Sequence, residues 1–440
     1  MTYAQRFMSE CAPIFQSRSR PSDPAISKNW RSLMHTGFAY CSALCHPVMQ
    51  TMKDFVSAGG SCLNSDSSPN PRLPGDASID CAMAKEAHGA KVFFTVRPLA
   101  GEGIRETFGR LARALKDMDM DMAHLTVFGS VSASEAGMGA MRQLFGCIDW
   151  PITWIEGGAC DGAPIAGMQV FAFARSKVHR IRLGGQVVGS VFEDGSAKHC
   201  LLSGLAPAQG STPRAEQTRR TLALLEKALA QGGFELSDLV RTWFFLDDIL
   251  AWYEEFNHAR TEVYSGIKFR SGSMPASTGV GGRNTATVAL TLAAWAVQPA
   301  NSATRVQEIS SPLQCPAPTY GSSFCRAMEI GSASGRNLLV SGTASIAPHG
   351  ETLWKGSVHK QVDLTMEVLE AILHSCNFTF SDLTRVVAYF SRRSDVLAFA
   401  DWCARRDVHS LPIVIARCDI CRDDLLFEIE ADAWKPNQVR

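Results

Sequence analysis

The sequence predicts an α+β protein in which three related units form a pseudo-trimer within one chain. One motif occurs twice in the same phase, as Phe234-x-Leu-Ser-Asp-Leu-x-Arg241 and Phe378-x-Phe-Ser-Asp-Leu-x-Arg385. Each occurrence lies between an amphipathic helix pattern and an apolar strand pattern, and a weaker copy of this order comes before both. Packing three similar sheets around a pseudo-threefold axis would bury the apolar face of each.

The middle copy has the clearest element boundaries. Thr212-Pro213 opens a helix, Leu222, Leu225 and Leu229 share one of its faces, and Gly232-Gly233 closes it. The other elements that we expect in this copy are strands at 181–192, 201–205, 243–246 and 285–297 and a second helix with Trp252 and Phe256.

The last copy repeats this order, with a helix stripe made by Leu364, Val368 and Ile372. Its expected strands are at 327–330, 337–341, 386–390 and 425–433, and its second helix carries Phe399 and Trp402. The first copy is weaker, with strands at 91–96, 124–129, 152–156 and 169–174 around its helices. We expect that this copy has lost much of its opening hairpin.

The domain boundaries follow from these copies. Residues 1–80, rich in Ser, Pro, Asn and Asp from 57 to 78, are expected to be a disordered leader and linker. Repeats are then expected at 81–177, 178–300 and 301–440. Independent domains on flexible linkers are the alternative, but the connections near 175–178 and 298–305 are too short for that arrangement.

Composition narrows the class of function. The 440 residues carry 43 Lys+Arg and 43 Asp+Glu, so no net positive charge favours nucleic acid or an anionic membrane as a partner. No apolar stretch reaches the length of a membrane span, and the start has no signal-peptide pattern. The 14 cysteines are too irregular for a disulfide scaffold and indicate reduced thiols in a cytoplasmic protein.

The repeat resembles the RidA/YjgF fold, also described as chorismate-mutase-like, which forms trimers with ligand clefts between subunits. Glu428-Ile-Glu430-Ala431 is similar to the terminal strand of that family. Its imine deaminases hold the substrate carboxylate with an arginine shortly after a proline. The corresponding positions here are roughly Thr153, Ser277 and Val414, so the resemblance to the deaminases is weakened.

A more specific resemblance is to the chorismatases, which look like fused RidA-type pseudo-trimers. Four segments carry it: Arg241–Asn257, Pro275–Gly282, Leu339–Ile346 and Arg417–Glu430. The resemblance implies that Arg417 binds substrate, that Glu428 is the catalytic glutamate, and that Cys421 contributes to the reaction. By the same resemblance Ala344 lines the substrate site.

The residues themselves suggest how such a site would work. Chorismate is a dianion with an enolpyruvyl ether, and removal of pyruvate requires protonation of the vinyl methylene by a carboxylic acid. Glu428 and Glu430 share one face of a strand, so burial and mutual repulsion should raise the pKa of at least one. We expect Glu428 to be the acid. Without the resemblance, the favoured explanation would be that both glutamates hydrogen-bond to backbone or pair with arginine in a polar seam between repeats.

Two substrate carboxylates call for arginine clamps. Arg417 is the first candidate because we expect its strand to pair with the strand of Glu428, and Arg241, Arg270 and Arg283 are weaker candidates. The hydroxyls and backbone N–H groups of Ser277-Thr278-Gly279 could also bind a carboxylate, although this segment could equally be a strand entry with a tight turn.

The resemblance makes Cys421 a marker of the product. Cysteine at this position goes with the chorismatases that form 3-hydroxybenzoate rather than a dihydroxycyclohexadiene carboxylate. A small, poorly hydrated side chain would keep water from the cationic centre and favour capture by the ring hydroxyl. A free cysteine is also a common small core residue, which is the structural alternative.

The sequence therefore predicts a cofactor-free chorismatase that releases pyruvate and 3-hydroxybenzoate for secondary metabolism. A diene diol or 4-hydroxybenzoate is the alternative product. Two other functions stay open: a RidA-like imine or enamine deaminase, and a non-catalytic protein that binds a small acid. Internal threefold closure predicts a monomer.

Overall fold

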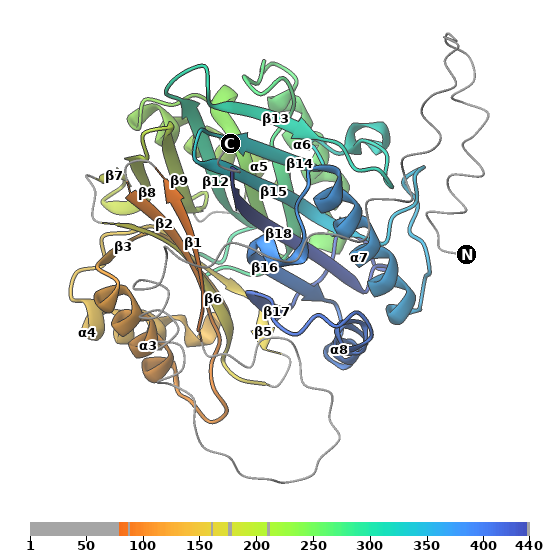
Figure 1. The fold of residues 1–440 in the computed structure, drawn as a ribbon, viewed down its shortest axis with the longest axis horizontal. Coiled ribbons are helices and arrows are strands. Elements are labelled where there is room, and N and C mark those ends of the chain that lie inside the picture. The colour runs from red at the N-terminus through yellow and green to blue at the C-terminus, as the bar shows by residue number, and fades with distance from the viewer. Residues whose placement is uncertain (1–78, 87–88, 160–161, 175–177, 209–211, 438–440) are drawn as a thin grey trace, which may run out of the picture. The chain divides into compact units, whose positions relative to one another are not determined.

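The structure is a computed structural model that describes residues 79–86, 89–159, 162–174, 178–208 and 212–437. Within these residues, three β-sheets each carry two α-helices, which confirms the predicted α+β class with three repeats (Figure 1). Residues 1–78 of the predicted leader lie outside the described part of the chain. Ile79 and Asp80, which the prediction gave to the leader, already belong to the first strand.

The first repeat has a five-stranded sheet in the order β1-β2-β6-β3-β4. Its elements are β1 (Ile79–Glu86), β2 (Gly89–Val96), α3 (Ile104–Asp117), β3 (Met120–Gly129), α4 (Ser134–Phe145), β4 (Ile152–Glu156) and β6 (Ile165–Ala174). The expected loss of the opening hairpin is wrong, because β1 pairs antiparallel with β2 from Ile79↔Val96 to Glu86↔Gly89. Strand β1 is an edge strand that contains alanine, aspartate and lysine, so its sequence gives only a weak strand pattern.

The second repeat has a six-stranded sheet in the order β11-β10-β12-β9-β8-β7. Its strands are β7 (His179–Leu183), β8 (Gln186–Glu193), β9 (Ala197–Leu205), β10 (Leu239–Leu246), β11 (Ala276–Gly281) and β12 (Leu290–Pro299), and its helices are α5 (Arg214–Gln231) and α6 (Tyr253–Tyr264). The predicted opening strand at 181–192 is in fact the hairpin of β7 and β8, which turns at Gly184-Gly185 with positive φ at both glycines.

The third repeat forms most of a seven-stranded sheet in the order β13-β14-β15-β18-β16-β17-β5. Its strands are β13 (Arg305–Ile309), β14 (Ala327–Gly331), β15 (Gly335–Ala344), β16 (Leu383–Phe390), β17 (Ile413–Arg417) and β18 (Phe427–Pro436), and its helices are α7 (Val358–Ser375) and α8 (Val396–Arg405). The last strand, β5 (Gly158–Ala159), comes from the first repeat and pairs with β17, which links the two repeats directly.

The strand register relates the three repeats residue by residue. A β-bulge comes immediately before His124, Arg241 and Arg385 at the same place in the strands β3, β10 and β16. Each of these strands pairs with a parallel neighbour, namely β4, β11 and β17. The residues that pair with the second position after His124, Arg241 and Arg385 are Thr153, Thr278 and Val414, so these three positions are equivalent. The predicted set of equivalent positions was Thr153, Ser277 and Val414. It is therefore wrong by one residue in the second repeat, where Thr278 takes the place of Ser277.

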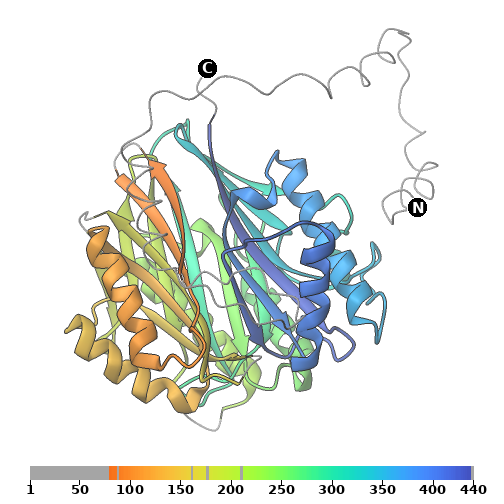
Figure 2. The same ribbon diagram turned by 60° about the horizontal axis from the view of Figure 1, so that its bottom comes forward.

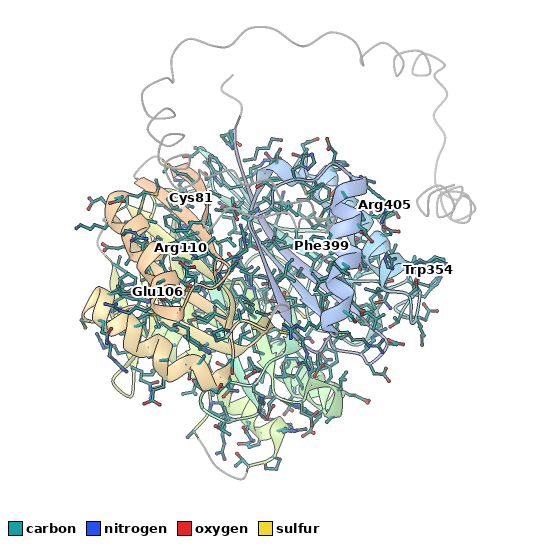
Figure 3. All side chains as sticks on the ribbon, turned by 90° about the horizontal axis from the view of Figure 1, so that it is seen from below. Cys81, Glu106, Arg110, Trp354, Phe399 and Arg405 are labelled. Atoms are coloured by element: carbon teal, nitrogen blue, oxygen red, sulfur yellow. The ribbon has the colours of Figure 1, made fainter. Side chains whose placement is uncertain are left out.

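The inner faces of the three sheets meet in a common core, and the helices cover the outer faces (Figure 2). Phe171, Trp295 and Tyr389, one from each sheet, belong to this core and are at most 5% exposed. Helix α8 shows the pattern on the outer face: Phe399 is buried against the sheet, whereas Arg405 points outward and pairs with another exposed side chain (Figure 3). No helix among the described residues has the length and apolar composition needed to cross a membrane.

Candidate active site

A cleft between the second and third repeats gathers most of the predicted site residues. Its space, counted together with its opening to solvent, is about 550 Å³. Strand β11 and helix α6 supply one wall, and strands β15 and β18 supply the other. The lining residues are Tyr253, Arg260, Ser277, Gly279, Tyr320, Ser322, Phe324, Arg326, Gly342, Ala344, Ile346, Cys421, Arg422, Leu425 and Glu428.

Glu428 is the carboxylic acid of this cleft. It lies near the start of β18, opposite Tyr389 on one neighbouring strand and Ala344 on the other, and it is 5% exposed. Burial raises the pKa of Glu428 to about 8, and the negative charge of Glu430 adds to this effect. The carboxyl group therefore keeps its proton near neutral pH, as an acid catalyst must.

Glu430, two residues further along the same face, is in the opposite electrostatic state. It accepts hydrogen bonds from Arg385 Nη2 at 2.5 Å and from Arg241 Nη2 at 2.7 Å, and the Tyr389 hydroxyl lies 3.2 Å away. Burial alone would raise the pKa of Glu430, but the two guanidinium groups outweigh burial and lower it. Glu430 is therefore a fixed negative charge behind the acid.

The segment Ser277-Thr278-Gly279 forms part of the cleft, with Ala344 on the opposite wall. Ser277 and Gly279 line the cleft, and Thr278 lies behind them. The Thr278 hydroxyl accepts hydrogen bonds from Arg241 Nη2 at 2.7 Å and from a backbone N–H of β15 at 3.0 Å. Thr278 thus connects the cleft wall to the ion pairs around Glu430.

Arg417 does not reach the cleft. It is exposed at the end of β17, where it pairs with β5. Its strand was expected to pair with the strand of Glu428, and this expectation is wrong because β16 lies between β17 and β18. Strands β16 and β17 are joined through helix α8 and run parallel, and the closing strand pairs with the other edge of β16.

The other predicted arginines also lie outside the cleft lining. Arg241 is fully buried and binds Glu430, so it supports the site from behind. Arg270 is exposed and lies 2.7 Å from Asp238 on a different part of the surface. Arg283 is exposed as well and pairs loosely with a glutamate of the first repeat at 3.5 Å.

Three arginines that sequence reasoning missed line the cleft instead, namely Arg260, Arg326 and Arg422. Arg260 is 2% exposed, donates to Asn257 Oδ1 at 2.7 Å, and lies over the rings of two phenylalanines of the second repeat. Arg326 is 4% exposed and donates twice to the backbone carbonyl of residue 315. Arg260 comes seven residues after Tyr253 and lies on the same, otherwise apolar, face of the helix. This spacing was a signal in the sequence that could have identified it.

Cys421 lies in the cleft wall and packs against a small apolar cluster that contains Ala344 and Ile346. Burial raises the pKa of the Cys421 thiol to about 12, so the side chain is a neutral thiol rather than a thiolate nucleophile. Tyr253 borders the same part of the cleft, and burial raises the pKa of its hydroxyl above the usual range. Cys421 and Tyr253 therefore add no charge to the cleft wall beside Glu428.

This arrangement can bind a small organic dianion and protonate it. Three guanidinium groups face one cleft, and Glu428, which holds its proton, is the one carboxyl group among the described residues that line it. The positively charged guanidinium groups would bind the carboxylates of such a ligand by paired hydrogen bonds. Among the described residues, no group of three or more His, Cys, Asp or Glu side chains could hold a metal ion.

The chain was compared with protein families and with known proteins. No family model matches the chain. The chain is 29% identical over 242 residues to the 3-hydroxybenzoate synthase of Streptomyces hygroscopicus, spanning 49% of this chain and 68% of that protein. It is 28% identical over 211 residues to a chorismatase of Streptomyces rapamycinicus, spanning 44% of this chain and 63% of that protein.

A solved structure extends the likeness to the fold. The crystal structure of a chorismatase superposes with a TM-score of 0.57 at 18% identity, and the match covers 80% of this chain and 99% of that one. The expected resemblance to the chorismatases is therefore confirmed in curated relatives and in a solved neighbour.

Proposed function

We propose that this protein converts chorismate and releases pyruvate, with 3-hydroxybenzoate as the second product. The observation that carries the proposal is Glu428, a protonated buried carboxyl group in a cleft with three arginines. The likeness to a 3-hydroxybenzoate synthase and to chorismatases supports the same substrate class. Such a product would serve secondary metabolism.

Glu428 starts the proposed reaction by giving its proton to the methylene carbon of the enolpyruvyl group. The double-bond electrons form the new C–H bond and leave an oxocarbenium-like centre at the ether carbon. A neutral acid is needed here because a carboxylate has no proton to give. The pKa of about 8 supports this role at neutral pH.

Arg260 and Arg326 are the proposed carboxylate clamps, in place of the predicted Arg417, Arg241 and Arg270. Both line the cleft and both are almost fully buried, so their charge is poorly screened by water. Ser277 Oγ, which lies 3.4 Å from Arg260 Nη1, and the backbone of Gly279 complete the proposed subsite for one carboxylate.

The proposed chemistry requires no cofactor, because proton transfer and bond cleavage use groups of the chain and substrate alone. We also propose that the protein acts as a monomer, since the inner faces of its three sheets bury one another. Its many cysteines favour the reducing cytoplasm as the place of the reaction.

The test is incubation of the purified protein with chorismate, followed by separation of the products and an enzymatic assay for pyruvate. We expect pyruvate and 3-hydroxybenzoate in equal amounts. In D2O, the pyruvate methyl group should gain one deuterium, which reports protonation of the methylene carbon. Absence of pyruvate would contradict the proposal. Release of ammonia from amino-acid-derived imines would then favour a deaminase, and tight binding of chorismate without turnover would favour a binding protein.

A further inference from the structure

Two segments border the cleft on the side of Cys421. The first rim segment, residues 313–325, includes the 3-10 helix Ala317–Tyr320 and places Tyr320 and Phe324 in the cleft wall. The second rim segment, residues 344–353, places Ala344 and Ile346 there. Both segments thus form part of the cleft wall.

Arg422 connects these two segments. Its Nη1 donates to the carbonyl oxygen of Gly350 at 2.7 Å and lies 3.4 Å from Thr352 Oγ1, both in the second rim segment. Its guanidinium group also lies over the ring of Tyr320 in the first rim segment, 5.9 Å from the ring centroid. A charged hydrogen bond and a ring contact from one side chain therefore hold both segments at the cleft.

The contact between Gly350 and Tyr320 leaves little room between the segments. Gly350 has φ of +96°, and a Cβ atom placed there would come within 3.1 Å of Tyr320 Cβ. The turn therefore packs directly against the tyrosine. Without Arg422, the Gly350 carbonyl would lose the hydrogen bond from this side chain, and the turn could move away from Tyr320.

Other contacts hold the rim segments without Arg422. Gln314 Nε2 donates to the carbonyl oxygens of Ala344 and Ile346 at 3.0 and 3.2 Å. Arg326 donates to the carbonyl oxygen of Cys315 at 2.9 and 3.0 Å. Removal of the Arg422 guanidinium should therefore loosen the turn at Gly350 and leave the rest of both segments in place.

We infer that Arg422 is a positioning residue that determines the product, because it holds the rim closed and keeps water from the cationic centre. This inference rests on the proposed function. Arg422 follows Cys421 directly in the chain, and Cys421 packs against Ala344 and Ile346 of the second rim segment. The small thiol and the anchored turn thus exclude water from the same part of the cleft.

Two reactions compete after Glu428 has protonated the methylene carbon. If water attacks the oxocarbenium carbon, a C–O bond forms and one water proton returns to the Glu428 carboxylate. The ether bond to that carbon then breaks as the proton of the new hydroxyl group passes to the ether oxygen, and pyruvate and a diene diol result. If the neighbouring ring hydroxyl attacks the ring carbon that carries the ether, the bond between that carbon and the ether oxygen breaks. The electron pair of the broken bond stays on the ether oxygen, which becomes the carbonyl oxygen of pyruvate. The proton of the attacking ring hydroxyl passes to the Glu428 carboxylate.

The ring-hydroxyl route consumes no water. The three-membered ring that it forms opens, a ring C–H proton is lost, the oxygen gains a proton, and 3-hydroxybenzoate results. Pyruvate and 3-hydroxybenzoate together contain the atoms of chorismate, whereas pyruvate and the diene diol contain one water more. Access of water to the cleft therefore sets the ratio of the two products.

The experiment compares Arg422→Gln and Arg422→Lys with the parent and with the control Lys355→Gln. Lys355 is a nearby cation that pairs with Asp424 at 2.8 Å, is 67% exposed and does not line the cleft. Total pyruvate and the ratio of diene diol to 3-hydroxybenzoate are measured with chorismate as substrate. We expect Arg422→Gln to raise this ratio about tenfold or more while pyruvate release falls by less than about tenfold.

The controls make the outcome decisive. Lys355→Gln should keep the parent ratio, and Arg422→Lys, which keeps the charge but loses the planar fork, should lie between the parent and Arg422→Gln. A merely structural role would lower total turnover at an unchanged ratio, and this result would overturn the inference. If Arg422→Gln does not fold, an unchanged ratio in Arg422→Lys overturns it equally.

The proposed function fails separately. If the parent releases no pyruvate from chorismate, the proposed function and this inference fall together. If the parent releases pyruvate and only the diene diol, conversion of chorismate stands and the inference is overturned, because there is then no exclusion of water to lose.

Discussion

Glu428 and Glu430 lie on the same face of strand β18, yet only Glu430 is paired with arginine. Glu430 is bonded to Arg241 and Arg385, whereas the described residues provide no hydrogen bond or ion pair to the Glu428 carboxyl group. The pairing makes one glutamate a permanent anion, and that anion helps to keep the proton on the other. Two identical side chains thus have different protonation states.

Replacement of the acid should abolish turnover and leave binding intact. In Glu428→Gln the side chain keeps its shape but has no acidic proton, so we expect kcat to fall about 10²- to 10⁴-fold with little change in chorismate affinity. Pyruvate release and calorimetric titration measure the two quantities. Asp423→Asn, an exposed neighbour outside the cleft, is the matched control. Parent-like turnover in Glu428→Gln would show that another group is the acid.

The activity should depend on pH through the proton on Glu428. The pKa of this group is raised to about 8, and the proposed reaction uses its protonated form. Activity should therefore be full well below pH 8 and fall as the pH rises through about 8. Measurement of kcat from pH 6 to 10 checks the direction. A rate that increases with pH over this range would mean that an ionised group, rather than a protonated acid, drives the reaction.

Gly342 should help to position the Glu428 carboxyl group, because a side chain at this place would meet it. A Cβ atom at this position would overlap with Glu428 Oε1. We expect Gly342→Ala to displace the carboxyl group and to reduce kcat about 10-fold or more, while the protein still folds. The control is Gly109→Ala in helix α3, where a Cβ atom meets nothing within 4 Å. That variant should be more stable by about 0.5–1 kcal/mol at unchanged activity. Equal activity of both variants would contradict the assigned position of Glu428.

The ion pairs behind the cleft should dominate the stability of the contact between the second and third repeats. Arg241 is fully buried, so Arg241→Met leaves Glu430 with a single arginine, and we expect a loss of about 3–5 kcal/mol in unfolding free energy. Arg219→Met, which removes an exposed pair with Glu262, serves as the control and should unfold like the parent. Denaturant titration measures both. A small effect at Arg241 would mean that Arg385 alone satisfies Glu430.

Cys421 should influence the product rather than the rate of protonation. Its thiol is neutral and forms part of the apolar wall beside Glu428. Cys421→Ala creates space that water can enter, so we expect a larger share of diene diol with pyruvate release within about tenfold of the parent. Chromatography of the products gives the share. A large loss of pyruvate at an unchanged product ratio would assign Cys421 to substrate binding instead.

The repeats and the strand that carries Glu428 follow from local patterns in the sequence. The motifs ending at Arg241 and Arg385 occupy equivalent positions after a β-bulge, as their shared phase predicted. The alternation of β18 placed Glu428 and Glu430 on one face. Both are local properties, because side-chain direction within a strand depends only on backbone periodicity.

Which arginines face Glu428 and which face Glu430 depends on how the repeats pack against one another. Arg241 meets Glu430 across 189 residues of chain because two sheets pack face to face, and Arg417 is separated from Glu428 by an inserted strand. Arg260, on a helix of another repeat, reaches the cleft for the same reason. Periodicity within one element carries no information about such contacts, since they depend on how separate sheets stack and in what order their strands pair.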